Sequence, residues 1–306
     1  MAPQYLPSLS SEKKSEFINS FDTIVSDCDG VIWRPEGVVP GAPEVINQFI
    51  ECGKRIIFIT NNSTKTREQF YAKVLKYGFN VSPENLYNTS SLVAQYTQQN
   101  LSSNKIVYVV GSPAIASELD ARNVKHFGVG KDELYEDFFE NVNSLKIDIK
   151  DNVGAVVVGF DQHISYVKML KAVTYLRNEE CLFVCTNTDE VFPTQSKIVL
   201  PGTGSIVAGI QVASGREPFI VGKPSTYVAE ALKEEKNIKP ERTLFIGDRC
   251  NTDIRMGNLC SFTTLLVLSG VHTFADVQKY ESSPKAEDQQ SVPQYYTDSI
   301  FDLCIK

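Results

Sequence analysis

The 306-residue sequence predicts an α/β fold in which helices cover both faces of mostly parallel sheets. The first observation is that short apolar runs rich in β-branched residues recur along the chain. The second is that segments with helical spacing of apolar residues lie between these runs, at 67–78, 166–177 and 226–237. The third is that the runs end at or beside Gly, Asp, Asn, Thr or Lys, and open α/β sheets bind ligands beyond the carboxyl ends of their strands. The predicted strands are, in chain order, 21–27, 55–62, 105–111, 153–160, 181–187, 218–223, 243–248 and 263–270.

Composition and charge argue against several classes of protein. The chain is 42% hydrophobic and carries a formal net charge of -7. These values indicate an ordinary globular protein, not one that binds nucleic acid or an anionic membrane surface. No window approaches the roughly 18 to 20 apolar residues of a membrane span, and the amino terminus lacks the apolar core of a secretion signal. The seven scattered cysteines fit reduced thiols. We therefore expect a cytoplasmic protein whose partner is a small molecule, with no nucleic acid and no membrane.

Two carboxylates, Asp27 and Asp29, stand at the end of the first predicted strand. Such close carboxylates repel each other unless a cation lies between them, which indicates a hard metal, most simply Mg²⁺. Far along the chain, Asp248 ends another strand and Asp253 follows it. Asp248 could complete a metal shell begun by Asp27 and the backbone carbonyl of Asp29. A simple Asp-Gly turn, a loop acid and an acid at a helix N-terminus explain the same residues without a metal.

Two further polar groups follow strands. Thr60, Asn61 and Asn62 stand at the end of a predicted strand and shortly before a helix, where they either cap the helix or help its free amides to hold an anion. Lys223 closes the run 218–223 in the sequence VGKPS. A lone lysine usually lies on the surface, but the apolar flank and the following proline make this one less ordinary. The surrounding glycines do not form a Walker A loop, and the chain has no G-x-S-x-G elbow.

Together these groups resemble the haloacid dehalogenase-type phosphatase superfamily. The residues that carry the resemblance are DxDGV at 27–31, the strand-end Thr60, Lys223 and GDRCNTD at 247–253. Within the superfamily, the sequences ITNNS and VGKPS are similar to the branch that holds 4-nitrophenyl phosphatases, phosphoglycolate phosphatases and pyridoxal phosphate phosphatases. The resemblance covers nearly the whole chain. It implies a doubly wound parallel-sheet core formed by 1–103 and 217–306, with an inserted α/β cap of the C2 type at 104–216.

The resemblance also implies a role for each of these residues. Asp27 is expected to attack phosphorus and become an aspartyl phosphate, while Asp29 protonates the leaving oxygen and later activates water. Lys223 is expected to restrain Asp27 and neutralise charge on the phosphoryl oxygens. The implied phosphate ligands are Thr60, Asn61, Asn62 and Lys223. The implied Mg²⁺ ligands are Asp27, the carbonyl of Asp29, Asp248, and Asp253 either through water or through the orientation of its neighbours.

The predicted cap contains a candidate substrate-reading loop, Cys185–Pro193, with a plain connecting loop as the alternative. Phe192 in this loop stands where pyridoxal phosphate phosphatases of the branch carry a histidine, which argues against a specialist for that substrate, although Phe192 could stack on a ring. The expected function is a Mg²⁺-dependent phosphatase for a small phosphate monoester, acting as a homodimer through its cap. The alternatives are a pyridoxal phosphate phosphatase or phosphoprotein phosphatase on the same core, and a catalytically silent scaffold.

Overall fold

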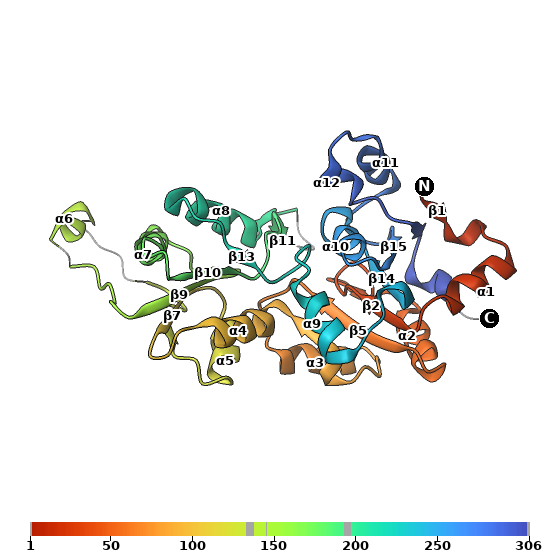
Figure 1. Cartoon of the computed structure of the whole chain (residues 1–306), viewed down its shortest axis with the longest axis horizontal. Coiled ribbons are helices and arrows are strands. Elements are labelled where there is room, and N and C mark those ends of the chain that lie inside the picture. The colour runs from red at the N-terminus through yellow and green to blue at the C-terminus, as the bar shows by residue number, and fades with distance from the viewer. Residues whose placement is uncertain (1, 133–137, 145, 193–196, 305–306) are drawn as a thin grey trace. The chain divides into compact units, whose positions relative to one another are not determined.

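The computed structural model describes residues 2–132, 138–144, 146–192 and 197–304, apart from the side chains of 234 and 235. The chain forms two compact units, whose elements are labelled in Figure 1. The first unit comprises Met1–Thr60, Glu68–Tyr87 and Lys223–Lys306, and the second comprises Asn61–Arg67 and Asn88–Gly222. The second unit is thus larger than the insert at 104–216 that the sequence suggested. That the second unit acts as a cap stays a prediction.

The first unit is built on a seven-stranded sheet with the order β1-β16-β15-β14-β2-β5-β6. The strand pairs from β1 to β5 are parallel. The chain adds β5 and β6 on one side of β2, and it returns later to add β14 on the other side. Such a topological switch point is where open α/β sheets bind ligands. The strands are β1 (Gln4–Tyr5), β2 (Thr23–Ser26), β5 (Arg55–Thr60), β6 (Leu86–Asn88), β14 (Thr243–Gly247), β15 (Thr263–Val267) and β16 (Tyr295–Thr297).

Helices pack on both faces of this sheet because successive strand residues point to opposite sides. On one face, Ile24 belongs to a buried cluster with Phe49 of α2 (Ala42–Glu51). On the other face, Leu266 of β15 packs with Val277 of a C-terminal helix. The remaining helical elements of this unit are η1 (Leu6–Ser8), α1 (Ser11–Asn19), α3 (Arg67–Lys76), η2 (Pro83–Asn85), α9 (Tyr227–Lys236), η3 (Pro240–Arg242), η4 (Cys250–Ile254), α10 (Arg255–Leu259), α11 (Phe274–Ser282), α12 (Ala286–Gln289) and η5 (Ile300–Leu303). A small hairpin, β3 (Trp33–Arg34) with β4 (Gly37–Val38), follows β2.

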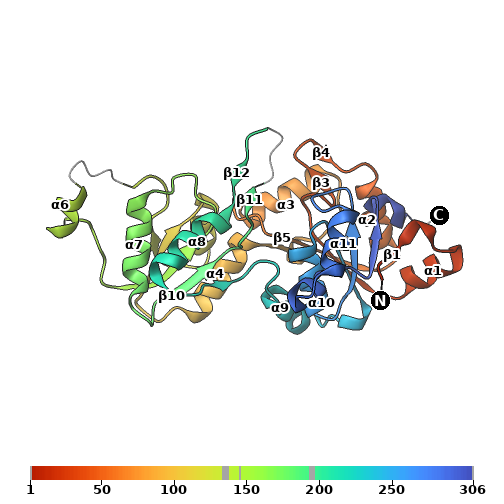
Figure 2. The same cartoon turned by 90° about the horizontal axis from the view of Figure 1, so that it is seen from above.

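The second unit has its own five-stranded parallel sheet, with the order β13-β10-β9-β7-β8. Two helices lie side by side on one face of it (Figure 2), where Ala172 of α7 and Val207 of α8 join a buried cluster with Val156. The strands are β7 (Ile106–Val110), β8 (His126–Phe127), β9 (Val153–Val158), β10 (Leu182–Cys185), β13 (Phe219–Ile220) and the antiparallel pair β11 (Val191–Phe192) and β12 (Leu200–Pro201). The helices are α4 (Thr89–Asn100), α5 (Pro113–Asp120), α6 (Phe138–Asn143), α7 (Tyr166–Leu176) and α8 (Thr203–Ser214).

The predicted fold class is confirmed: a doubly wound parallel-sheet core carries a second α/β unit inserted in its sequence. The prediction that the whole run 218–223 forms a strand of the core is wrong. Only Phe219–Ile220 form a strand, which pairs with Val184 and Cys185 at the edge of the second sheet. The run is apolar enough for a strand, but the choice of sheet depends on tertiary pairing. Within the described residues, no helix has the length and apolarity to cross a bilayer.

Candidate active site

Three acidic side chains gather beyond the carboxyl ends of the core strands. Asp27 follows β2, and Asp248 follows the neighbouring β14. Asp253 lies in η4, a short π-helical turn five residues after Asp248. Carboxylate oxygens of these three residues lie within 4.8 Å of one another, and all three residues are buried. The parallel pairing of β2 and β14 therefore brings together acids more than 200 residues apart in the chain, at the switch point of the sheet.

Lys223 provides the positive charge of this cluster. Its Nζ lies 2.6 Å from Oδ1 of Asp27 and 2.7 Å from Oδ1 of Asp253, and the residue is 2% exposed. The same ammonium lies 3.4 Å from the carbonyl oxygen of Ile59, at the end of β5. Lys223 thus reaches the site from the segment that follows the second sheet, and it holds Asp27 by direct contact.

The carboxylates of Asp253 and Asp248 have different environments. Oδ2 of Asp253 accepts hydrogen bonds from the backbone amides of Asp248 and Arg249, and its Oδ1 faces Lys223. Oδ2 of Asp248 accepts a hydrogen bond from the amide of Val271 at 2.8 Å. Oδ1 of Asp248 is buried and has no hydrogen-bond partner among the described residues. Asp253 is therefore committed to holding the loop and Lys223, whereas Asp248 has a ligand atom to spare.

The charges of the cluster fit a divalent cation. Three carboxylates and one ammonium leave two negative charges uncompensated in a buried site. Burial raises the pKa of Asp27 well above its usual value, and repulsion by Asp253 and Asp248 adds to this against the attraction of Lys223. Burial, with repulsion by Asp253, likewise raises the pKa of Asp248 to about 7. A hard cation with oxygen ligands would remove this repulsion and satisfy the unpaired Oδ1 of Asp248.

Burial also acts on Lys223, where it lowers the pKa of the ammonium. Attraction by Asp253 and Asp27 outweighs burial, so the pKa of Lys223 is raised above its usual value. The lysine therefore stays charged throughout the neutral range. This is the state that can neutralise both a carboxylate and the oxygens of a phosphoryl group.

Gly30 allows the first acidic loop to approach Asp248. Its φ is +87°, a region that side chains disfavour, and a Cβ atom there would lie 2.2 Å from Oδ2 of Asp248. The glycine in the motif is thus required both by backbone conformation and by space.

The carboxyl group of Asp29 contacts different residues from those that Asp27 contacts. Its Oδ1 accepts a hydrogen bond from Nε1 of Trp33 at 2.9 Å, and its Oδ2 lies 3.4 Å from the hydroxyl of Thr60 at the end of β5. Nζ of Lys73, on α3, lies 3.8 Å from Oδ1. Of these neighbours, Thr60 was predicted as a site residue, and Trp33 and Lys73 were not. The signal was present for Trp33, which closes the stretch SDCDGVIW four residues after Asp29.

Asn61, Asn62 and Phe192 belong to the second unit, although Asn61 directly follows Thr60 in sequence. Nδ2 of Asn61 donates to Oδ1 of Asp189 at 3.0 Å, within the candidate substrate-reading loop. Oδ1 of Asn62 accepts hydrogen bonds from the amide and the hydroxyl of Thr64. The ring of Phe192 lies 5.0 Å from that of Phe160, and Pro193 at the end of the loop lies outside the described residues. Phosphate binding by the two asparagines and substrate contact by Phe192 stay predictions.

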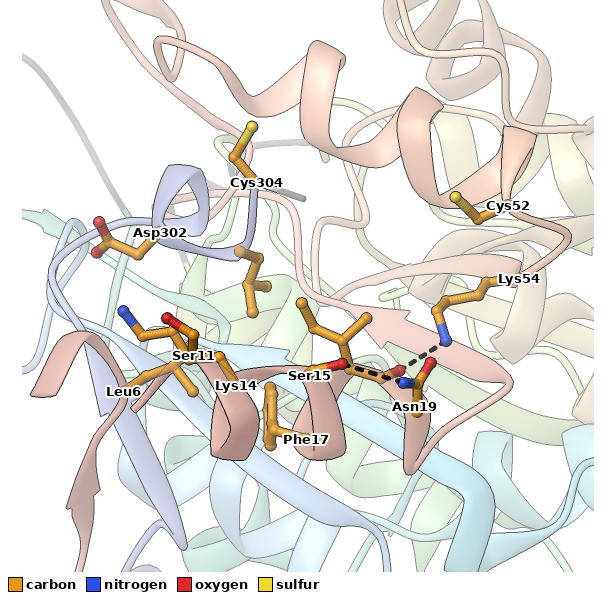
Figure 3. Close-up of a pocket in the computed structure, with 12 residues that line it drawn as sticks. Leu6, Ser11, Lys14, Ser15, Phe17, Asn19, Cys52, Lys54, Asp302 and Cys304 are labelled. Atoms are coloured by element: carbon orange, nitrogen blue, oxygen red, sulfur yellow. Dashed lines mark hydrogen bonds between the residues drawn. The ribbon is translucent and has the colours of Figure 1, made fainter. Parts of the chain in front are cut away.

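A separate pocket of about 600 Å³ lies in the first unit against α1 (Figure 3). Its wall includes Lys54, whose Nζ donates to the carbonyl oxygens of Ile18 and Phe21 at 2.7 Å, and Asn19, whose amide donates to Ser15. The Lys54 ammonium is thus used in holding the end of α1 to the core, and the Asn19 amide in a hydrogen bond within α1. The buried acids and Lys223 therefore mark the candidate active site, and this pocket does not.

Comparisons with known proteins agree with the fold. A family model described as haloacid dehalogenase-like hydrolase matches residues 24–125, and a related HAD-hydrolase-like model matches 220–294. The chain is 42% identical to mouse glycerol-3-phosphate phosphatase over 302 residues, which are 96% of this chain and 94% of that protein. It is 36% identical to human chronophin, with coverage of 92% and 91%.

Solved structures show the same architecture. Glycerol phosphate phosphatase from Mycobacterium tuberculosis, in complex with magnesium, superposes with a TM-score of 0.75 at 25% identity, covering 94% of this chain and 78% of that one. NagD from Escherichia coli K-12 superposes with a TM-score of 0.73 at 26% identity, covering 92% and 98%. On these relationships, the chain belongs to the haloacid dehalogenase-like hydrolase family and to its phosphatase branch.

Proposed function

We propose that the protein is a Mg²⁺-dependent phosphatase that hydrolyses small phosphate monoesters through a phosphorylated Asp27. The observation that carries this proposal is the buried cluster of Asp27, Asp248 and Asp253 with Lys223, in which an oxygen of Asp248 has no hydrogen-bond partner among the described residues. Such a cluster would be strained without a cation and supplies the oxygen ligands that Mg²⁺ prefers.

In the first step, a carboxylate oxygen of Asp27 forms a bond to phosphorus while the bond from phosphorus to the ester oxygen breaks. Asp29 gives its proton to the departing oxygen. Lys223 keeps Asp27 oriented and neutralises charge on the phosphoryl oxygens, with the hydroxyl of Thr60 as a further contact. A divalent cation held by Asp27, Asp248 and the Asp29 carbonyl, with Asp253 orienting the loop, would supply further charge neutralisation.

In the second step, Asp29 takes a proton from a water molecule whose oxygen bonds to phosphorus. The bond from Asp27 to phosphorus breaks, inorganic phosphate leaves, and both carboxyl groups return to their starting states. The two steps need a nucleophile and a proton carrier that differ in environment. The buried, lysine-paired Asp27 and the half-exposed Asp29 differ in this way.

The substrate is proposed to be a small alkyl or aryl phosphate. The similarity to glycerol-3-phosphate phosphatases supports glycerol phosphate as a candidate beside phosphoglycolate and 4-nitrophenyl phosphate. Phe192, where a histidine would favour pyridoxal phosphate, supports an ester without a phosphopyridoxal ring. Phosphate release across these four esters, with Phe192→His alongside, tests the choice. A preference of the unmutated protein for pyridoxal phosphate would contradict it, and a phosphopeptide hydrolysed faster than all four would favour the phosphoprotein alternative.

Asp27→Asn tests the nucleophile and also the scaffold alternative. We expect the variant to fold and to lose about a thousandfold or more in kcat, because the attacking carboxylate is absent. Asp151→Asn, at an exposed aspartate of the second unit, is the matched control and should leave kcat unchanged. Phosphate release by Asp27→Asn at the rate of the control would refute the assignment of the nucleophile. An unmutated, Mg²⁺-loaded protein that hydrolyses no ester would support the silent scaffold.

We further propose that residues 104–216 form the essential part of a cap and that two copies pair through it. Exposed apolar side chains of the second unit support a protein contact there, including Phe139, Tyr166 and Val212, which are 79%, 71% and 84% exposed. Sedimentation of Tyr166→Glu with Val212→Glu tests this, and dimers that persist in the double variant would place the interface elsewhere. The cytoplasmic location stays a prediction that cell fractionation would check.

A further inference from the structure

The indole of Trp33 holds one oxygen of Asp29, the residue proposed to move the proton. Nε1 of Trp33 donates to Oδ1 of Asp29 at 2.9 Å, a distance typical of a well-formed hydrogen bond. A hydrogen bond to a charged acceptor is stronger than one between neutral groups. The contact therefore fixes the direction in which the carboxyl group of Asp29 points.

The backbone between the two residues is tightly folded. The carbonyl oxygen of Cys28 accepts hydrogen bonds from the amides of Val31, Ile32 and Trp33, and the amide of Gly30 donates to the carbonyl of Trp33 at 2.7 Å. The loop thus returns on itself and places residue 33 beside residue 29. The distance from Asp29 to its partner is set by a closed turn, so the hydrogen bond does not depend on a flexible segment.

The indole is also fixed by its surroundings. Trp33 is 1% exposed. Its ring centroid lies 6.5 Å from that of Phe58 and 6.1 Å from those of Phe70 and Phe79, with interplanar angles of 68° to 84°. Edge-to-face packing of this kind is favourable and leaves one orientation for the ring. The N–H group is thus presented to Asp29 by a rigid aromatic cluster.

The contact makes the two oxygens of Asp29 unequal. An indole nitrogen can only donate, so Oδ1 is the acceptor of this bond, and the unprotonated, carbonyl-type oxygen of a neutral carboxyl group is the better acceptor. The proton of a neutral Asp29 is thereby directed to Oδ2, which lies 3.4 Å from the hydroxyl of Thr60 at the end of β5. Oδ2 is the oxygen that lies toward the proposed phosphate contact.

We propose that Trp33 is a positioning residue for proton transfer: its N–H reserves Oδ1 of Asp29 and leaves Oδ2 to deliver the proton to the leaving oxygen. This inference rests on the proposed function. The balance of the step is unchanged, because the proton passes from Oδ2 to the ester oxygen, and Oδ1 keeps its hydrogen bond throughout.

Lys73 also lies close to Asp29 and is the alternative candidate for orienting its carboxyl group. Its Nζ lies 4.1 Å from the centroid of the Trp33 ring and 3.8 Å from Oδ1 of Asp29. The side chains of Lys73 and Asp29 are 26% and 36% exposed, so water screens this charge pair. The lysine stacks on the indole, whereas the direct short contact to Asp29 comes from Nε1.

The experiment compares kcat/KM for two esters whose leaving groups need protonation to different degrees. Nitrophenolate is a stable anion, whereas an alkoxide must be protonated as it departs. Because Trp33 is the only tryptophan of the chain, biosynthetic replacement of tryptophan by benzothienylalanine changes this residue alone, exchanging N–H for sulfur in a ring of the same shape. Trp33→Phe is the second variant. With glycerol 3-phosphate, we expect kcat/KM to fall about tenfold more than with 4-nitrophenyl phosphate, as loss of one charge-assisted hydrogen bond predicts.

The controls separate three kinds of failure. Asp29→Asn should show the same preference for the nitrophenyl ester more strongly. If Asp29→Asn affects both esters equally, the assignment of Asp29 in the proposed function is wrong. If Asp29→Asn shows the preference and neither Trp33 variant does, only the present inference is overturned. Phe79→Leu disturbs the same aromatic cluster and should leave the ratio of the two kcat/KM values within about twofold. The same ratio change in Phe79→Leu or Lys73→Met as in the Trp33 variants would also overturn the inference.

Discussion

Removal of the Lys223 ammonium tests the electrostatic account of the site most directly. In Lys223→Met, a side chain of similar length keeps the packing, but Asp27 and Asp253 lose the charge that lies 2.6 and 2.7 Å from their oxygens. Breaking a buried ion pair by removing one partner costs about 3–5 kcal/mol, since the remaining charge stays buried and uncompensated. For a domain of this size, such a loss lowers the unfolding midpoint by roughly 6–20 °C.

Mg²⁺ should offset much of this loss. The variant leaves three buried carboxylates without the ammonium that contacts Asp27 and Asp253, so it gains more than the unmutated protein from a divalent ion. We expect the difference in unfolding midpoint between the two proteins to be large in chelator and clearly smaller in millimolar Mg²⁺. Activity should not recover in the same way, because phosphoryl oxygens still lack the lysine, and kcat/KM should stay about a hundredfold or more below that of the unmutated protein.

Lys168 in the second unit supplies a matched control. Its Nζ lies 2.5 Å from Oδ2 of Asp161, and the two side chains are 1% and 2% exposed. Lys168→Met should therefore destabilise the protein by a similar amount, but Mg²⁺ should give it no extra protection, because its partner is not part of the acid cluster. Equal unfolding midpoints for Lys223→Met and the unmutated protein in chelator would refute the role of Lys223 as the charge that balances the acids. Equal rescue of both lysine variants by Mg²⁺ would refute the proposed metal site.

Three other predictions concern the loops around the acids and one helix cap. Gly30→Ala should lower the free energy of unfolding by at least about 1–3 kcal/mol and remove most of the activity, because φ is +87° and the new Cβ would lie 2.2 Å from Oδ2 of Asp248. Thermal unfolding and phosphate release measure the two effects, and unchanged values would contradict the predicted steric clash. In chelator, the unfolding midpoint should fall as pH rises from about 4 to about 7, because the folded protein holds a proton on Asp248, whose pKa is raised to about 7, that the unfolded chain releases at lower pH. This fall of the midpoint with pH should be weaker in Asp248→Asn and in the presence of Mg²⁺. A midpoint that instead rises with pH in the unmutated protein, but not in Asp248→Asn, would exclude the raised pKa of Asp248. Asp276→Asn should lower the midpoint more at pH 7 than at pH 3. Hydrogen bonds from Lys279 and Thr273 hold the pKa of Asp276 below its usual value, so the stabilisation is complete at pH 7 and is partly lost at pH 3; an equal effect at both pH values would contradict this.

The parts of the site that could be predicted from sequence are those fixed by local structure. Asp27, Thr60 and Asp248 each stand where a buried parallel strand of the core ends, and the carboxyl ends of parallel strands share one edge. Asp253 could be predicted to lie near Asp248 because only a short turn separates them. The strands β2, β5 and β14 that end at or just before these residues are short, buried apolar runs of four, six and five residues, and such runs indicate buried parallel strands when helical segments lie between them.

The parts that could not be predicted depend on tertiary pairing. The family resemblance implied that Lys223 restrains Asp27, but the apolar run before Lys223 was assigned to the wrong sheet, because no local pattern shows which sheet a two-residue strand joins. The large apolar side chain of Trp33 predicts only that the residue is buried. The closed turn after Asp29 is needed to show that its N–H group donates a hydrogen bond to Asp29. β6 and β16 are three residues each, too short to show a period. Asn61 donates to Asp189, 128 residues away, so its neighbours could not be inferred from ITNNS.

The boundary between the two units falls within the sequence Thr60-Asn61-Asn62, after Thr60. Thr60 ends β5 and lies beside Asp29, while the carbonyl of Asn61 accepts hydrogen bonds from Thr89 and Asn187 of the second unit. The chain crosses back to the first unit between Gly222 and Lys223. Two residues proposed to contact the phosphoryl group are therefore the last and first core residues at crossings between the units. We therefore expect a change in the second unit that displaces Asn61 or Gly222 to affect Thr60 or Lys223, because one peptide bond joins each pair. Asp189→Ala, which removes the partner of the Asn61 amide, should thus alter kcat as well as KM. An effect on KM alone would show that the candidate loop acts only by binding.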